Sequence, residues 1–199
     1  AEALEATVDL AVQGRYFFIK AIDWSQDGKY IAVAVDSTLV IVDVATRSIL
    51  QSRSDLGVGG LPHLKWIEGS RKVALLDNLG FIYIYDVSEN RVAKSIEIGP
   101  DMGAGETYVY NSFDWDEKRD WFAVPLLGSS SIAFWDGEGN LISDLVRSNP
   151  DNYNWLESKC LTSDLPVEFL GVNSDLHRLL WSHDGNHLAI TISGGLVLC

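Results

Sequence analysis

The sequence is poor in cysteine and in basic residues, and each shortage excludes a class of protein. Only Cys160 and Cys199 occur in 199 residues, too few for a disulfide framework, so we expect an intracellular protein in a reducing compartment, the cytoplasm or nucleus. Fifteen Lys and Arg residues stand against 28 Asp and Glu residues, for a net charge of −13. Because phosphate binding needs clustered Lys and Arg, we expect no direct nucleic acid binding. An acidic surface instead favours protein partners with basic surfaces.

Long apolar runs and phosphate or nucleophile motifs are also missing. No apolar run reaches the ~18 residues of a membrane-spanning helix, so we expect no membrane insertion. The glycine-rich stretch at 57–60 precedes a predicted strand, and it therefore lacks the helix N-terminus that would bind phosphate. No G-x-S-x-G nucleophile elbow is present. We therefore predict no cofactor and no catalytic residues.

The chain is rich in short apolar strands separated by tight turns. Hydrophobic residues make up 47% of the sequence, with seven each of Trp, Tyr and Phe, a composition that suits half-buried pleated surfaces. The clearest stretch is 14–50, where strands are predicted at 19–25, 30–35 and 38–44. Asp27-Gly28 makes the first turn, because glycine adopts positive φ at little cost. Weaker versions of this stretch recur three more times.

The copies are anchored by Trp24, Trp66, Trp115 and Trp181, at intervals of 42, 49 and 66 residues. Periods of ~40–45 residues with about four strands each are typical of β-propeller blades. The longest interval contains an insertion at 148–170. Asp23-Trp24 and Asp114-Trp115 recur as a pair, which predicts Asp outside and Trp inside.

These copies resemble the WD40 repeat family over nearly all of residues 14–199. Gly14, Gly105 and Gly171 each stand ten residues before an anchor Trp, and Trp135-Asp136 matches the family's closing dipeptide. Two stretches match the family's Ser-Pro-Asp-Gly-like turn: Ser25-Gln26-Asp27-Gly28 and Ser182-His183-Asp184-Gly185. The family's His after the Gly is replaced in every copy, by Arg15, Val58, Glu106 and Val172. The resemblance implies an all-β propeller of four-stranded antiparallel blades that rely on apolar packing more than on a buried polar network.

The resemblance divides residues 1–199 into one propeller segment with about three full blades and partial blades at both ends. The predicted parts are a blade tail at 1–13, blades at 14–55, 56–98 and 99–147, the insertion loop at 148–170, and a partial blade at 171–199. An unclosed propeller would leave a long exposed sheet edge. We therefore expect the ring to be completed by further residues or by another chain, with a closed four-blade ring as the less favoured alternative.

Three sets of residues could suggest catalysis or metal binding. His183, Asp184 and His187 have a four-residue spacing that converges ligands on a helix, but here it spans a hairpin turn. His63 and His177 have no acidic or cysteine companions nearby in sequence. Asp43, Asp86 and Asp136 recur at one structural position, which indicates a strand-end role. We predict no metal site.

The insertion holds the candidate partner-binding residues. It carries aromatic side chains among carboxylates, which is typical of a binding loop for a partly basic partner: Tyr153, Trp155, Glu157, Asp164 and Phe169. The alternative is a loop that covers one face of the ring with its own aromatic residues.

The repeat and the lack of any catalytic set unique to one blade predict a non-catalytic scaffold for protein–protein interaction. Such a scaffold would form part of a larger WD40-like propeller protein or of a multi-subunit assembly. The alternative is a propeller enzyme or small-molecule-binding protein with its site at the central channel.

Overall fold

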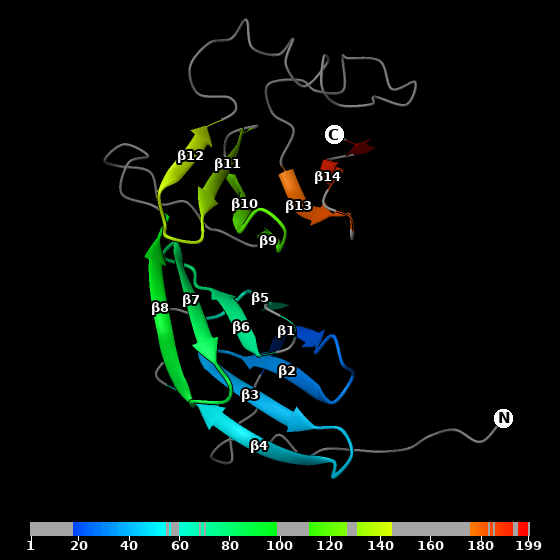
Figure 1. Ribbon diagram of the computed structural model, residues 1–199, viewed down its shortest axis with the longest axis vertical. Helices are drawn as coiled ribbons and strands as arrows, with labels where there is room; N and C mark the ends of the chain where they lie inside the picture. The colour runs from blue at the N-terminus through cyan, green and yellow to red at the C-terminus, as the bar shows by residue number, and fades with distance from the viewer. Residues whose placement is uncertain are drawn as a thin grey trace, which may run out of the picture. The chain divides into compact units, whose positions relative to one another are not determined.

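The computed structural model describes residues 18–54, 56, 60–67, 69, 71–98, 112–126, 131–144, 176–182, 184, 186–192 and 195–198. Within these residues the chain forms fifteen β-strands and no helix (Figure 1). No helix of the described part is therefore long and apolar enough to cross a membrane. The predicted all-β fold is confirmed.

The strands form four sheets, in each of which neighbouring strands are consecutive in the chain and antiparallel. The first sheet contains β1 (Ile19–Trp24), β2 (Tyr30–Val35), β3 (Thr38–Asp43) and β4 (Ser48–Arg53). The second contains β5 (His63–Ile67), β6 (Lys72–Leu76), β7 (Phe81–Asp86) and β8 (Arg91–Glu97). The third contains β9 (Asp114–Asp116), β10 (Trp121–Leu126), β11 (Ser131–Asp136) and β12 (Leu141–Asp144). The fourth contains β13 (Leu176–Trp181), β14 (Leu188–Ile192) and β15 (Gly195–Leu198).

The four sheets lie within the ranges 14–55, 56–98, 99–147 and 171–199 expected for the blades, while the blade boundaries themselves stay predictions. The blade tail at 1–13 and the insertion at 148–170 lie outside the described residues.

A serine and an aspartate shape the first turn of the first and fourth sheets. Ser25 Oγ accepts a hydrogen bond from the Tyr30 amide at 2.8 Å and donates to Asp27 Oδ1 at 2.8 Å. Gly28 completes this turn with φ 70°, the positive value that glycine adopts without strain. In the fourth sheet Ser182 Oγ accepts from the His187 amide at 2.9 Å and donates to an aspartate at 2.6 Å. The turns predicted from the sequence are thus stabilised by the same side-chain bonds.

Aspartates at the end of the third strand hold the next turn. Their carboxylates accept hydrogen bonds from the turn that follows, and these bonds favour the ionised form, so the pKa of each is lowered below its usual range. The strongest donor for each is the Thr46 amide for Asp43, the Ser88 hydroxyl for Asp86 and the Asn140 side-chain amide for Asp136. These contacts agree with the strand-end role expected from the sequence.

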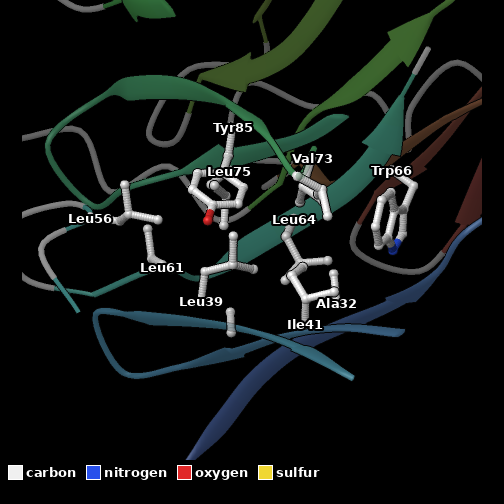
Figure 2. Packing of buried hydrophobic residues seen from close by; sticks show 12 residues of the cluster. Ala32, Leu39, Ile41, Leu56, Leu61, Leu64, Trp66, Val73, Leu75 and Tyr85 are labelled. Atoms are coloured by element: carbon white, nitrogen blue, oxygen red, sulfur yellow. The ribbon is translucent and has the colours of Figure 1, made fainter. Parts of the chain in front are cut away.

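The chain divides into two compact units. The first unit, residues 1–78 and 82–95, holds nearly all of the first two sheets. Its core joins Ala32, Ala34, Leu39 and Ile41 of the first sheet to Leu64, Trp66, Val73, Leu75 and Tyr85 of the second, with Leu56 and Leu61 from the connecting segment (Figure 2). Tyr30 stacks on Trp66 with ring centroids 6.3 Å apart. The first and second sheets are therefore packed face to face.

The second unit, residues 79–81 and 96–199, holds the third and fourth sheets around a cluster of aromatic rings. Phe122 lies between Trp115, at 4.0 Å between centroids, and Phe113, at 5.9 Å. On the opposite face of the third sheet, Phe134 contacts Trp181 of β13 at 6.2 Å. The third and fourth sheets therefore also pack through aromatic side chains.

Candidate functional site

The structure leaves the predicted binding residues untested. Tyr153, Trp155, Glu157, Asp164 and Phe169 all lie outside the described residues, so their role stays a prediction.

In the turn at 183–187, which was weighed above as a metal site, the carboxylate of Asp184 stabilises the turn itself. Asp184 accepts hydrogen bonds from the Ser182 hydroxyl and from the Asn186 amide and side chain. These bonds, led by the Ser182 hydroxyl, hold the pKa of Asp184 well below its usual range. Across the part of the chain that the structure describes, no group of three or more His, Cys, Asp or Glu residues could hold a metal ion.

One aspartate of β1 joins the first sheet to the second. Asp23 Oδ2 accepts a hydrogen bond from the Trp66 amide at 2.8 Å, and the Trp66 indole Nε1 donates to the Asp23 carbonyl at 3.1 Å. Asp23 Oδ1 also accepts from the Trp24 amide at 3.0 Å. The single carboxylate of Asp23 therefore accepts hydrogen bonds from the backbone amides of two successive anchor tryptophans, one on each sheet.

The second unit repeats this joint. Asp114 of β9 accepts a hydrogen bond from the Trp181 amide of β13. The indole nitrogen of Trp181 is buried and has no hydrogen-bond partner within the described residues, unlike that of Trp66. The guanidinium of Arg119 lies 5.7 Å from the Trp181 ring, and its Nη1 contacts Asp116 Oδ2 at 2.5 Å. Carboxylate and cation together thus fix this tryptophan.

The position across the strand pair from the residue before each anchor Trp is always alanine. The registers pair Asp23 with Ala32, Lys65 with Ala74, Asp114 with Ala123, and Leu180 with Ala189. Ala32, Ala74 and Ala123 are fully buried, and Ala32 belongs to the cluster that contains Trp66 of the next sheet. At position 32 a methyl group leaves room for the bulky indole of Trp66. We call the alanine at this position, Ala32, Ala74, Ala123 or Ala189, the seat. The sequence reasoning missed it, although an Ala stands eight residues after every anchor Trp.

The first sheet departs from the other three at the anchor Trp and at the residue two positions before it. Its Ile22 and Trp24 are 60% and 54% exposed. The residues at the same two positions in the other sheets are far more covered: Leu64 is 3% and Trp66 7% exposed, Phe113 1% and Trp115 7%, and Leu179 5%. The expectation of Asp outside and Trp inside is therefore wrong at Trp24, and also at Asp114, which is only 2% exposed.

We call Ile19, Ile22 and Trp24 the incoming face. The register pairs them with Val35, Val33 and Ile31, on the face of the first sheet turned away from the second. Ile19 is 58% exposed, so three large apolar side chains of one strand are each more than half uncovered. Full burial of such a side chain stabilises by roughly 1.5–3 kcal/mol. The valines of β2 and β3 on this face are buried, so the exposed apolar surface is confined to the edge strand β1.

Comparison with known proteins identifies the fold. No protein-family model matches the chain, and no curated protein matches it in sequence. Among solved structures 1173 chains match, so the architecture is too widespread to select a function. One of them is the β-propeller domain of Cps50 (Swd1) from Myceliophteria thermophila, with a TM-score of 0.64 and 14% identity over 92% of this chain. The chain covers 50% of that domain's length. At this identity the likeness shows the fold alone, and that fold is the β-propeller.

Proposed function

We propose that the chain is a non-catalytic scaffold for protein–protein interaction, part of a larger WD40-like propeller protein or of a multi-subunit assembly. The observation that carries this proposal is the incoming face, because it repeats the side chains that bind a neighbouring sheet elsewhere in the chain and yet is uncovered. Apolar surfaces of this kind on soluble proteins mark interaction sites, and aromatic residues such as Trp24 are enriched in them.

The WD40-like assignment is supported by the turns and by the blade ends. The Ser-x-Asp turn bonds occur in two sheets, as described above, and the Trp135 side chain is 4% exposed beside Asp136 at the end of β11. Net charge supports the choice of partner, since −13 across the chain favours basic partner surfaces around an apolar contact. The reducing compartment and the lack of catalysis remain parts of this proposal.

The proposal is tested by comparing the proteins that co-purify with tagged wild-type and variant chains. Trp24→Ser removes the indole from the incoming face. Leu50→Ser is the matched control, because Leu50 is 49% exposed on the outer strand β4. A scaffold that uses the incoming face loses a reproducible set of partners in Trp24→Ser and keeps them in Leu50→Ser. Identical partner sets for both variants and the wild type, with circular dichroism showing both variants folded, would overturn the proposal.

A further inference from the structure

We infer that Asp116, Trp121 and Trp181 form a binding site for the guanidinium group of an arginine side chain, which a basic partner protein inserts in exchange for Arg119. We call these three residues the cation box. The box lies wholly within the second unit and shares no residue with the incoming face. The inference therefore goes beyond the proposed function, and each of the two can fail without the other.

The cation box arises at a turn where the third sheet departs from the first and the fourth. The turn after the anchor Trp begins with Ser25 in the first sheet and with Ser182 in the fourth, and a glycine stands three residues later in both. The third sheet has Asp116 in place of the serine and Arg119 in place of the glycine. Where the other two turns close through a hydroxyl, this turn pairs a carboxylate with a cation.

The carboxylate of Asp116 is buried and both of its oxygens are engaged. Its side chain is only 2% exposed. Oδ2 lies 2.5 Å from Arg119 Nη1, and Oδ1 accepts a hydrogen bond from the Lys118 amide at 3.0 Å. A buried charge without a partner is costly, so Asp116 requires a cation at this place. Another guanidinium meets this requirement as well as Arg119 does, and an exchange between the two leaves no charge unpaired.

Two indoles complete the box around that cation. The guanidinium carbon of Arg119 lies 5.9 Å from the centre of the Trp121 ring, at the start of β10. It lies 5.7 Å from the centre of the Trp181 ring, at the end of β13. Both distances fall within the ~6 Å at which a cation is attracted to the face of an aromatic ring, and Trp attracts it most strongly. The box thus supplies one charge and two aromatic faces from two neighbouring sheets.

The first unit shows the same two ring positions in a different arrangement. Tyr30 occupies the place of Trp121, since each pairs with the strand-end aspartate of its own sheet, and Trp66 occupies the place of Trp181. Tyr30 stacks directly on Trp66, with 24° between the ring planes, and a glycine stands in the place of Arg119. Two sheets therefore join at these positions without a guanidinium, and the cation box is a feature added to the joint in the second unit.

Arg119 can leave the box while its turn stays in place. Its side chain is 37% exposed, so a partner can reach the guanidinium from the solvent. The backbone of the turn is anchored separately, because the Asp120 carbonyl accepts a hydrogen bond from the Gly137 amide at 2.8 Å. The net charge of −13 attracts basic partners. Arginine suits the box better than lysine, because a planar guanidinium faces an aromatic ring and contacts a carboxylate with its edge.

The experiment titrates the folded chain with N-acetyl-arginine amide and follows the indole N–H signals of Trp121 and Trp181 by NMR of tryptophan-labelled protein. Arg119→Gly opens the box with the residue that the first and fourth sheets have at this place. We expect both signals to shift in the wild type, and binding to be roughly tenfold tighter in Arg119→Gly, because the tethered cation no longer competes. The matched control adds Asp116→Ser to Arg119→Gly. It supplies both residues of the first-sheet turn without the carboxylate, and it should lose the binding.

N-acetyl-citrulline amide, which has a similar shape without the charge, should shift neither signal in any of these chains. Signals that do not move in Arg119→Gly, equal shifts with the two probes, or binding that survives Asp116→Ser each overturn the inference. Binding to Arg119→Gly but not to the wild type overturns it too, because Arg119 is then a permanent part of the joint. Circular dichroism separates loss of binding from loss of fold, and the wild-type titration decides the question if a variant does not fold. The co-purification test at Trp24 is unaffected by any of these results.

Discussion

Replacing Asp23 by alanine tests whether one carboxylate holds the first two sheets together. The substitution removes the acceptor of the Trp66 amide, 2.8 Å away, while the carbonyl that binds the Trp66 indole stays in place. Trp66 is 7% exposed, so water cannot easily replace the lost acceptor. The hydrogen bond from the Trp24 amide to Asp23, in contrast, is exposed, so in the variant this amide can donate to water instead.

The magnitude follows from the Trp66 amide. A hydrogen bond to a charged group contributes about 1.5–3 kcal/mol, and a buried donor left without its acceptor costs a similar amount. We therefore expect Asp23→Ala to lower the free energy of unfolding by about 2–3 kcal/mol. Asp23→Asn keeps one neutral oxygen that can accept from Trp66, so we expect a loss of about 1 kcal/mol.

Urea unfolding followed by circular dichroism and Trp fluorescence measures these losses. Lys20→Ala is the control on the same strand, because Lys20 is exposed and its ammonium lies 5.5 Å from the centre of the Phe18 ring. It should change the free energy of unfolding by no more than about 0.5 kcal/mol. An Asp23→Ala variant as stable as Lys20→Ala would refute the account of the joint.

Three further predictions concern the seat, the core hydroxyl and acid. Ala32→Leu should lower the free energy of unfolding by about 1–3 kcal/mol, because the larger side chain overpacks a fully buried site. Ala189→Leu should lower it much less, because Ala189 is only half-buried. Equal losses for the two variants in urea unfolding would contradict this expectation. Tyr85→Phe should cost about 1–2 kcal/mol, because the hydroxyl of the fully buried Tyr85 lies 2.5 Å from Asn90 Oδ1 and 3.0 Å from Gln51 Oε1; a wild-type urea midpoint would show that these contacts are dispensable. The pKa of Asp136 is lowered in the folded state, chiefly by the hydrogen bond from the Asn140 side-chain amide. The ionised carboxylate therefore stabilises the folded state fully above the unfolded pKa of about 3.9, and this contribution is lost as the pH falls through the lower folded pKa. Thermal melts from neutral pH to below pH ~4 should therefore show a shallower acid decline for Asp136→Asn than for the wild type, and parallel curves would count against this carboxylate.

The sequence predicted the sheets well because the features that define them are local. Asp27-Gly28 demands a turn wherever it occurs, and the serine at position 25 closes that turn on its own strand. The role of Asp136 at a strand end is also settled within four residues of sequence. Such contacts require no knowledge of any other sheet.

The joints between sheets could not be predicted in the same way, because they depend on partners 43 and 67 residues away. The pair Asp23-Trp24 looks the same in sequence as Asp114-Trp115, yet Trp24 is 54% exposed and Trp115 is 7% exposed. What differs is how far other parts of the chain cover each indole, and a strand's own residues do not encode that. For the same reason the candidate interaction face was found only in the structure, while the insertion proposed from composition stays a prediction.

The central claim, that the incoming face is an interaction surface, is tested most directly by photo-crosslinking from position 24. The chain is produced in cells with a photoreactive phenylalanine in place of Trp24, and separately in place of Leu50 on β4 as the control. The account predicts one dominant protein adduct from position 24 and none from position 50, with the crosslinked peptide identifying the occupant. No adduct from position 24, or the same adducts from both positions, would contradict it.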